Sequence, residues 1–329
     1  MSHRPRTQAY RIGELAFRLE VVGNDQGLFR SWVHNEVSRD ASFSEGMALY
    51  VWDAQSTSSG YPELPWSAND HVGRGEIQGG DDPEVSITFC PGARVLVMID
   101  FKHAEAWYWT PDFSRLPFYE RAAPGRFFLS QLLRTQGALM VHGAAVAVNE
   151  ECGLLLAGPG GSGKSCTSIS GLRDPLKFLG DDYTGLSVGP APVLHSLYAS
   201  AKVYPDQVER LNLSGVSLTE TNEDEGKSVL YLHPEFQHSL LKSSKLKAVV
   251  IPQVTGGNQS EFEPLSKIKT LRALAPSSLF QLPFSGVADF SALSQVIKTY
   301  PTYRLRLGVD PQEIQDVIYA FLQAEGGES

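Results

Sequence analysis

The chain contains little cysteine and no cysteine pattern. Its 329 residues include three cysteines, Cys90, Cys152 and Cys166, with no C-x-x-C spacing and no histidines clustered near them. Structural zinc sites and disulfide frameworks depend on such spacings. We therefore expect three buried free thiols rather than a zinc site or a disulfide-stabilised scaffold.

Long apolar runs and an excess of positive charge are also absent. No segment approaches the roughly 20 apolar residues that a membrane-spanning helix needs. The first residues, MSHRPRTQAYRIG, are basic but lack the apolar stretch of a secretory signal. The formal net charge of −9 argues against broad binding to nucleic acid or to anionic membranes. We therefore expect a cytoplasmic protein that binds neither, and we leave open whether it forms a homo-oligomer.

What is present is the composition of a folded globular protein. Hydrophobic residues make up 42% and charged residues 20% of the chain, which is typical of soluble domains. Short β-branched and aromatic runs between residues 16 and 110 predict a β-rich module. Later in the chain strand-like and helical patterns are mixed, which predicts an α/β domain. With the boundary at AAPG, we expect a β-rich module over residues 1–125, a candidate for substrate recognition, and an α/β domain over residues 126–329.

The strongest motif is a phosphate-binding loop. The stretch GPGGSGKS, residues 158–165, satisfies G-x-x-x-x-G-K-[ST] and lies between the apolar run GLLLAG and a run that fits the start of a helix. Its glycines allow left-handed backbone angles and let N–H groups converge on phosphate oxygens. Lys164 would reach the β- and γ-phosphates, and Ser165 would supply a hydroxyl to magnesium. The expected nucleotide-binding residues are Gly158, Pro159, Gly160, Gly161, Ser162, Gly163, Lys164, Ser165 and Cys166.

Two adjacent carboxylates follow this loop closely. Asp181 and Asp182 end the short apolar run KFLG, with room for about two helical turns between it and the loop. We expect this strand to be a close neighbour of the strand before the loop, with its carboxyl end at the same crevice. One carboxylate would bind magnesium and the other would accept the proton of an attacking hydroxyl. The alternative is a solvated Asp-Asp turn. Which carboxylate has which role stays open, and Ser165 with Asp182 is our candidate pair of magnesium ligands.

A histidine precedes the loop. If ALMVHGAAVAV and GLLLAG form one hairpin that turns at NEEC, counting from the turn places His142 opposite Pro159, at the mouth of the loop. A histidine there would orient an aspartate or balance its charge, because its pKa lies near neutrality and responds to a carboxylate. The alternative is a core histidine whose nitrogens bond to the backbone.

Together these residues resemble a known enzyme family. A histidine-bearing strand, a GxxxxGKS loop, one short helix and a strand ending in Asp-Asp are similar to HPr kinase/phosphorylase, whose fold is related to the phosphoenolpyruvate carboxykinase core. The likeness covers roughly residues 137–308 and rests on GPGGSGKS, FLGDDY, LHSLYASAKVYPD and PTYRLRLGVD. It is closest to the HPr-kinase-like enzymes of peptide-modification clusters, including kinases of lasso-peptide precursors.

The resemblance implies ATP and magnesium as cofactors and a peptide or small protein as the acceptor. It implies that Lys164 and Ser165 handle phosphates and magnesium, and that one aspartate is the base and the other a metal partner. His142 would be their neighbour. The glycine-rich signature that follows the aspartates in HPr kinase is not recognisable here, which argues against HPr itself as the acceptor and against the reverse phosphorylase reaction.

Three further side chains are secondary candidates for the site. Lys202 follows a strand, and the resemblance places it near the transferring phosphate. Lys227 begins a strand after an acidic loop that is either a surface loop or a lid. Arg304 alternates with Arg306 in TYRLRLG, so that either one of them points to the nucleotide or they form a structural ion pair.

We therefore expect a kinase that transfers the γ-phosphoryl group of ATP to a serine or threonine hydroxyl of a peptide or small protein, with an aspartate as general base. Two alternatives stay open. One is a small-molecule kinase of the same fold that acts on a sugar or an amino acid. The other is a nucleotide-gated binding module without catalysis, against which the second carboxylate argues, because a sensor needs only the metal-linked one.

Overall fold

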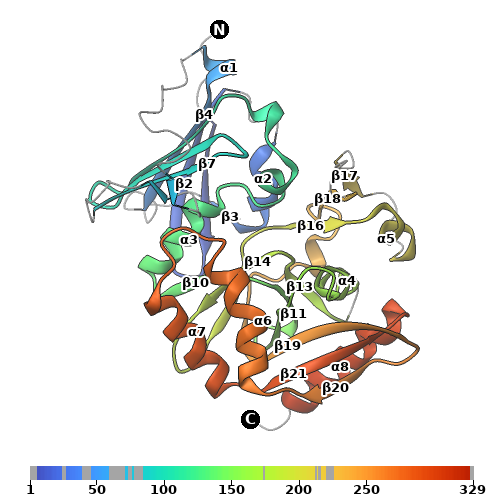
Figure 1. The fold of residues 1–329 in the computed structure, drawn as a ribbon. Coiled ribbons are helices and arrows are strands. Elements are labelled where there is room, and N and C mark those ends of the chain that lie inside the picture. The colour runs from blue at the N-terminus through green and yellow to red at the C-terminus, as the bar shows by residue number, and fades with distance from the viewer. Residues whose placement is uncertain are drawn as a thin grey trace. The chain divides into compact units, whose positions relative to one another are not determined.

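The structure is a computed structural model of the chain (Figure 1). It describes residues 6–23, 27–38, 46–58, 71–72, 76–77, 84–172, 175–211, 213, 216–219 and 226–326. The architecture is mixed α/β with several sheets and helices, as the sequence predicts.

By internal contacts the chain forms two compact units. The first comprises Met1–Gln136 and Leu282–Phe284, and the second Gly137–Gln281 and Ser285–Ser329. The boundary that the sequence suggests, near residue 125, lies one helix earlier in the chain. Helix α3 (Arg126–Thr135) therefore belongs by its contacts to the first unit.

The first unit is built on one sheet, in which the described residues form nine strands in the order β3-β1-β2-β4-β9-β8-β7-β6-β5. Its strands are β1 (Arg6–Ile12), β2 (Leu15–Val22), β3 (Glu36–Val37), β4 (Met47–Asp53), β5 (His71–Val72), β6 (Glu76–Ile77), β7 (Val85–Cys90), β8 (Val95–Asp100) and β9 (Glu105–Thr110). The strand-like runs of the sequence predict β2, β4, β7, β8 and β9. They miss β1, because its sequence RTQAYRI is too polar for the pattern.

Aromatic rings fill one face of this sheet. The rings of Tyr10, Phe17 and Trp32 lie with their centroids 5.4 to 5.5 Å apart, and Phe128 of α3 packs on Phe17 at 5.4 Å. Trp32 comes from η1 (Leu28–Asn35). On the other face Trp52 and Trp109 form a cross-strand pair at 5.2 Å. These aromatics therefore have the usual structural role of core residues and cross-strand pairs. The remaining helices of this unit are α1 (Ala54–Thr57), η4 (Phe113–Arg115) and α2 (Phe118–Ala122).

The second unit contains the large sheet that carries the loop. Its path among the described residues is β10-β14-β15-β19-β12-β11-β13, with β21 paired to β19 and β20 paired to β21. The strands are β10 (Ala138–His142), β11 (Ala144–Asn149), β12 (Cys152–Leu156), β13 (Lys177–Gly180), β14 (Tyr183–Ser187), β15 (Val193–Ser196), β19 (Ser243–Gly257), β20 (Glu261–Pro264) and β21 (Thr302–Gly308).

Helices cover both faces of the central strands. Successive side chains of a strand point to opposite faces. Ala145 and Leu155 accordingly pack with α6 (Lys267–Leu279) and α7 (Val287–Thr299), whereas Val146 and Leu154 pack with α8 (Pro311–Gly326). Figure 1 shows α6 and α7 together, away from α8. A strand buried on both faces reads as a continuous apolar run, which is why GLLLAG carries no alternation.

A small sheet lies beside the loop helix in the second unit. Its order is β16-β18-β17, with β16 (Ser200–Val203), β17 (Ser217–Leu218) and β18 (Ser228–Tyr231). One of its faces packs on α4 (Lys164–Ser170) in a hydrophobic cluster that includes Ile169, Ala201, Val203 and Leu230. Nearby helices are α5 (Pro205–Arg210) and η5 (Gln237–Ser239). This cluster joins the small sheet to the helix that follows the phosphate-loop motif.

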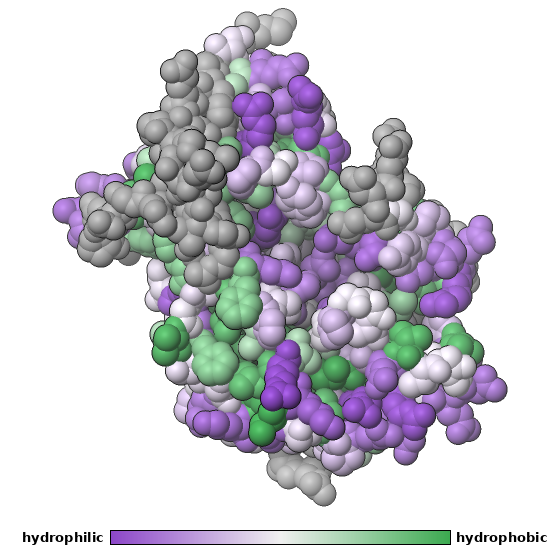
Figure 2. Space-filling model, viewed as in Figure 1, coloured by the Kyte–Doolittle hydropathy of each residue, from purple (hydrophilic) through white to green (hydrophobic). Residues whose placement is uncertain are grey.

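On the face shown in Figure 2, hydrophobic side chains gather over α6 and α7. The large exposed apolar residues of this helical region are Ile268, Phe280, Val287 and Phe290. In the described part of the chain, no helix combines the length and the apolar character needed to cross a bilayer.

Candidate functional site

The stretch GPGGSGKS forms the turn between β12 and α4. Gly158, Gly161 and Gly163 have φ angles of 140°, 78° and 108°, in the left-handed region where a side chain is strained. A Cβ on Gly163 would also overlap Cδ1 of Leu307, whereas a Cβ on Gly160 would meet nothing within 4 Å. The loop conformation therefore requires glycine at position 163 in particular and has open space at position 160.

Lys164, the first residue of α4, folds back onto the loop. Its ammonium group donates to the carbonyl oxygens of Gly158 at 2.6 Å and Pro159 at 3.0 Å. Burial lowers its pKa, although the charges of the two aspartates oppose that shift. Within the same loop the hydroxyl of Ser162 is buried and has no hydrogen-bond partner among the described residues. A buried polar atom of this kind calls for a water or an ion, so the loop has both a cation and a spare donor for an anion.

The strand order brings the acidic pair to the same edge of the sheet as the loop. Strands β12 and β13 each pair antiparallel with β11, so they run parallel to each other with one strand between them. The loop follows the carboxyl end of β12, and Asp181 and Asp182 follow the carboxyl end of β13. Ligands of α/β sheets bind outside such carboxyl ends. The predicted strand neighbourhood therefore holds, with β11 interposed.

Asp181 lies against α4 and is only 3% exposed. Its carboxylate accepts a hydrogen bond from the Ser168 hydroxyl at 3.4 Å and from the Lys202 N–H at 2.9 Å. Burial raises the pKa of Asp181 to about 6, and the charge of Asp182 adds to the rise, while hydrogen bonds from Lys202 and Ser165 oppose it. Asp181 is therefore the carboxylate next to Ser165.

Asp182 is paired instead with the ammonium group of Lys202, whose Nζ lies 2.6 Å from its Oδ2. Burial raises the pKa of Asp182, but Lys202 outweighs it, with smaller effects from His142 and Lys227, so the pKa lies below its ordinary value. Two neighbouring carboxylates thus have pKa values pushed apart by their surroundings. This pattern is typical of sites in which two acids perform different tasks.

His142 reaches the acidic pair by a route that differs from the predicted one. The hairpin of β11 and β12 forms, but Gly143 divides the run ALMVHGAAVAV into two strands, and β10 pairs with β14. The cross-strand partner of His142 is Tyr183, the residue after Asp182. The prediction that His142 lies opposite Pro159 is therefore wrong, because the strand does not continue through the glycine.

The ring of His142 is half-buried, and its pKa keeps it neutral at pH 7. Its Nδ1 has no hydrogen-bond partner among the described residues, and its centroid lies 5.4 Å from that of Tyr183. Burial lowers the pKa of His142 to about 4, with Asp182 opposing the shift and Lys164 adding to it. At neutral pH the imidazole therefore acts as a hydrogen-bonding group and not as a cation.

Oxygen ligands for magnesium gather around Ser165. Magnesium prefers oxygen ligands and is commonly held by one or two carboxylates together with nucleotide phosphates. Ser165 hydrogen-bonds to Asp181, whereas Asp182 is paired with Lys202. Ser165 and Asp181 therefore fit the ion better than the pair Ser165 and Asp182 that we selected from the sequence. Among the described residues no three His, Cys, Asp or Glu side chains are grouped to hold a metal by themselves.

Arg304 and Arg306 both form an ion pair with one carboxylate of the second unit. The guanidinium groups of Arg304 and Arg306 lie 3.4 and 3.3 Å from the carboxylate of Glu263 in β20. Of the two roles that the sequence leaves open, the structural ion pair is the one with described contacts. A contact of Arg304 with a nucleotide stays a prediction.

Lys227 lies beside an aromatic ring. Its Nζ is 4.9 Å from the centroid of the Tyr204 ring. Residues 220–225, in the acidic loop that the sequence predicts as a surface loop or a lid, lie outside the described residues.

Two contacts around α4 were not predicted from the sequence. The spacing of Ser168, one helical turn after Ser165, is a signal that could have suggested that both face Asp181. Gln207 has no such signal. It joins α5 to α4, because its side-chain amide donates to Cys166 Sγ at 2.8 Å. Burial raises the pKa of the Cys166 thiol, which therefore stays protonated and unreactive.

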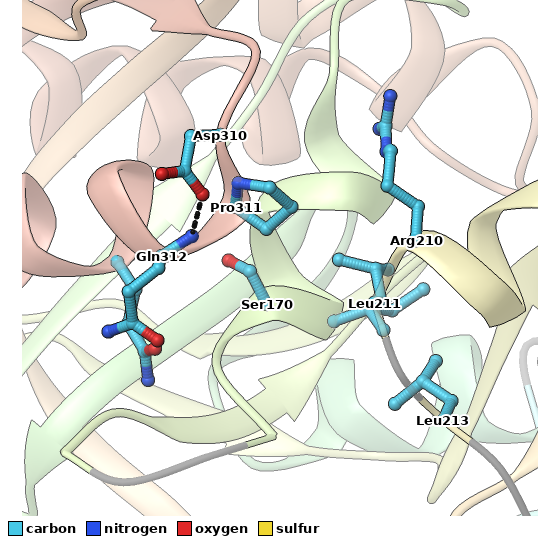
Figure 3. Close-up of a pocket in the computed structure, with 9 residues that line it drawn as sticks. Ser170, Arg210, Leu211, Leu213, Asp310, Pro311 and Gln312 are labelled. Atoms are coloured by element: carbon cyan, nitrogen blue, oxygen red, sulfur yellow. Dashed lines mark hydrogen bonds between the residues drawn. The ribbon is translucent and has the colours of Figure 1, made fainter.

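A pocket of about 140 Å³ opens beside the far end of α4 (Figure 3). It is lined by Ile169, Ser170, Arg210, Leu211, Leu213, Asp310, Pro311, Gln312 and Gln315. Arg210 links it to the loop helix, because its Nη2 also lies 3.9 Å from Cys166 Sγ. The pocket thus begins about one helical turn, near 5 Å, from the end of the phosphate-loop motif.

No family model and no curated protein sequence matches this chain. Its function is therefore inferred from the residues gathered at the edge of the sheet in the second unit: a glycine loop, a buried lysine and two unequal carboxylates.

Proposed function

We propose that this chain is an ATP- and magnesium-dependent kinase that transfers the γ-phosphoryl group to a hydroxyl of a peptide or small protein. The observation that carries the proposal is the position of Asp181 against α4, the helix that begins with the loop residue Lys164. Phosphoryl transfer requires a cation, oxygen ligands for a metal and a base around the terminal phosphate. All three kinds of group lie here at one edge of one sheet.

The nucleotide would lie along the loop and α4. Lys164 would exchange the carbonyl oxygens of Gly158 and Pro159 for phosphate oxygens, and the N–H groups of the glycine loop would complete the cradle. Ser162 would donate its buried hydroxyl, which gives that group the partner that it lacks. The pocket at the far end of α4 would take the nucleoside, because it offers both apolar and polar lining groups.

Ser165 and Asp181 would hold magnesium, which when bound neutralises charge on the phosphates. Asp182 would accept the proton of the acceptor hydroxyl, because it is not held against α4 and Asp181 would be occupied by the metal. The acceptor oxygen would form a bond to the γ-phosphorus as the bond from that phosphorus to the β,γ-bridging oxygen breaks. Lys202 would remain beside the transferring group and compensate its charge.

His142 would orient this base. It is the last residue of β10 and its cross-strand partner is Tyr183, so it lies next to the chain that carries Asp182. The low pKa of His142 keeps its imidazole uncharged at neutral pH, so it would act on Asp182 by its position and not as a cation. We therefore assign His142 a positioning role.

The likeness to HPr kinase/phosphorylase, and through it to the phosphoenolpyruvate carboxykinase core, supports the same activity and is part of the proposal. It also supplies the acceptor class, a peptide or small protein, and the first, β-rich unit is the proposed recognition module.

Acceptor mixtures with ATP and magnesium test this proposal. Separate reactions would contain a serine- and threonine-rich peptide library, a set of sugars and a set of free amino acids, each analysed by mass spectrometry for a gain of one phosphoryl group. We expect phosphorylation in the peptide set. Phosphorylation confined to sugars or amino acids would replace the acceptor class, and ATP binding without phosphorylation of any set would leave only a nucleotide-binding module.

A further inference from the structure

The register of the small sheet brings the side chain of Lys227 next to an aromatic ring. Strands β16 and β18 pair antiparallel, and Val203 lies opposite Ser228. One residue further along this antiparallel register, Tyr204 comes opposite Lys227. Opposite residues of such a ladder share a face of the sheet. The two side chains do meet there, with Nζ 4.9 Å from the ring centroid, within the range of a cation–π contact.

Lys202 lies on the same face as this pair. It precedes Tyr204 by two residues in an extended backbone, because Tyr204 has φ −78° and ψ 150° and strand side chains alternate with a period of two. The intervening Val203 belongs instead to the hydrophobic cluster under α4. One face of the small sheet packs on α4, and Lys202, Tyr204 and Lys227 lie on the other face, beside the buried Val229.

This lysine-bearing face is turned toward the acidic pair. Lys202 contacts Asp182 directly, at 2.6 Å. The charge of Lys227 also reaches the site: it adds to the lowering of the pKa of Asp182, after the larger effects of burial and Lys202, and to the lowering that burial imposes on Lys164. Lys227 therefore lies within electrostatic range of both the loop lysine and the proposed base.

Tyr204 is itself fixed to the loop helix. Its N–H donates to the side chain of Gln207 at 3.0 Å, and the other end of that amide donates to Cys166 Sγ at 2.8 Å. Cys166 follows Ser165 directly. Before the lysine, Gly226 has a φ of 66°, a left-handed angle that glycine adopts at little cost. The backbone of Tyr204 is thus tied through Gln207 to the residue that follows Ser165.

We propose that Lys227 is a phosphate-binding residue of this site and that Tyr204 is the positioning residue that directs it toward the terminal phosphate. The inference rests on the proposed kinase function and adds a third cation to it. Lys164 is bonded to backbone carbonyls and Lys202 to Asp182. In the described part of the chain Lys227 contacts a ring and no carboxylate. None of the described carboxylates pairs with Lys227, so its ammonium group can turn to an incoming anion without leaving a described carboxylate unpaired.

The affinities for AMP-PNP and ADP, both with magnesium, test this inference by titration calorimetry without any acceptor. The ratio of the two affinities isolates contacts with the terminal phosphate. We expect Lys227→Met to weaken AMP-PNP binding by about tenfold, the scale of one charge-assisted hydrogen bond, and to change ADP binding by no more than about twofold. Lys227→Arg should retain most of the AMP-PNP affinity.

The role of Tyr204 is tested by a matched pair of variants. Tyr204→Phe keeps the ring and should bind AMP-PNP like the unaltered protein, whereas Tyr204→Leu removes the cation–π contact and should weaken AMP-PNP binding about threefold. Lys245→Met, which removes an exposed lysine paired with Glu151, is the control and should change neither affinity.

The outcomes separate this inference from the proposed function. If the unaltered protein binds both nucleotides and Lys227→Met leaves their ratio unchanged, the role of Lys227 is overturned while the loop site stands. If Tyr204→Leu and Tyr204→Phe behave alike, the positioning role is overturned. If the unaltered protein binds neither nucleotide, the proposed function fails, and the inference fails with it.

Discussion

Lys202 contacts both carboxylates of the acidic pair, and it contacts them in different ways. Its ammonium group lies 2.6 Å from Asp182 Oδ2, while its backbone N–H donates to Asp181 Oδ2 at 2.9 Å. The full charge of the ammonium group outweighs burial at Asp182, so that pKa falls. A neutral N–H cannot outweigh burial at Asp181, where the pKa rises to about 6. A single residue of β16 thereby makes the two acids unequal.

The ion pair between Lys202 and Asp182 should show strong coupling in stability. Lys202→Met leaves Asp182 charged and largely buried without its partner, so we expect a loss of roughly 1 to 3 kcal/mol in the free energy of unfolding at pH 7. The double variant Lys202→Met/Asp182→Asn should recover most of that loss. Urea denaturation of the two single variants and the double variant measures the coupling, and strictly additive losses would contradict the pairing.

Asp181→Asn should stabilise the protein at neutral pH. The pKa of Asp181 is raised from 3.8 to about 6 in the folded state, so its contribution to stability is present below pH 3.8 and is lost as the pH rises through 6. Asparagine removes the cost of ionising a buried acid. We expect a gain of roughly 1 to 3 kcal/mol at pH 7, measured by urea denaturation in metal-free buffer. A loss of stability at pH 7 would contradict the buried position.

Asp181→Asn should also reveal the titration of His142 in the dependence of the free energy of unfolding on pH. The pKa of His142 falls from 6.5 to about 4 on folding, so its contribution is present above pH 6.5 and is lost as the pH falls through 4. In the unaltered protein Asp181 acts in the opposite direction over an overlapping range. We therefore expect the stability of Asp181→Asn to decline more steeply between pH 6.5 and pH 4 than that of the unaltered protein. No decline in the stability of Asp181→Asn between pH 6.5 and pH 4 would contradict the lowered pKa of His142.

The loop offers a matched pair of glycine variants. Gly163→Ala places a Cβ at a φ of 108° and against Leu307, so we expect a loss of about 2 to 4 kcal/mol in stability together with the loss of nucleotide binding. Gly160→Ala meets nothing within 4 Å and should change stability by less than about 1 kcal/mol. Thermal unfolding and calorimetry compare the two, and similar behaviour of both variants would contradict the loop conformation.

Much of the second unit could be predicted from the sequence, because its elements are signalled locally. The run GLLLAG, the loop glycines and the acidic ending of KFLG specify β12, the turn and the end of β13 by composition alone. The helices α6, α7 and α8 likewise follow from their apolar spacing. The elements that carry the candidate site, and the types of residue in it, could therefore be predicted from the sequence.

Strand partners and long-range contacts could not be predicted in this way. A strand pattern indicates which face of a strand is buried but does not name its neighbour, so the pairing of His142 with Tyr183 depended on the break at Gly143. The same holds for Lys202, whose contact with Asp182 arises because a separate small sheet packs on α4. Gln207 contacts Cys166 across 41 residues of sequence. Such contacts are set by tertiary packing, which overrides local pattern.

The central claim is that Lys164 and the two aspartates act on the terminal phosphate of one ATP molecule. The most direct measurement is the initial rate of ³²P transfer from [γ-³²P]ATP to the serine- and threonine-rich peptide library, for the unaltered protein, Lys164→Met, Asp181→Asn and Asp182→Asn. We predict no detectable transfer by Lys164→Met. We also predict that Asp182→Asn slows transfer by at least about a hundredfold while AMP-PNP affinity changes by less than about threefold. Full activity in both asparagine variants would contradict the account.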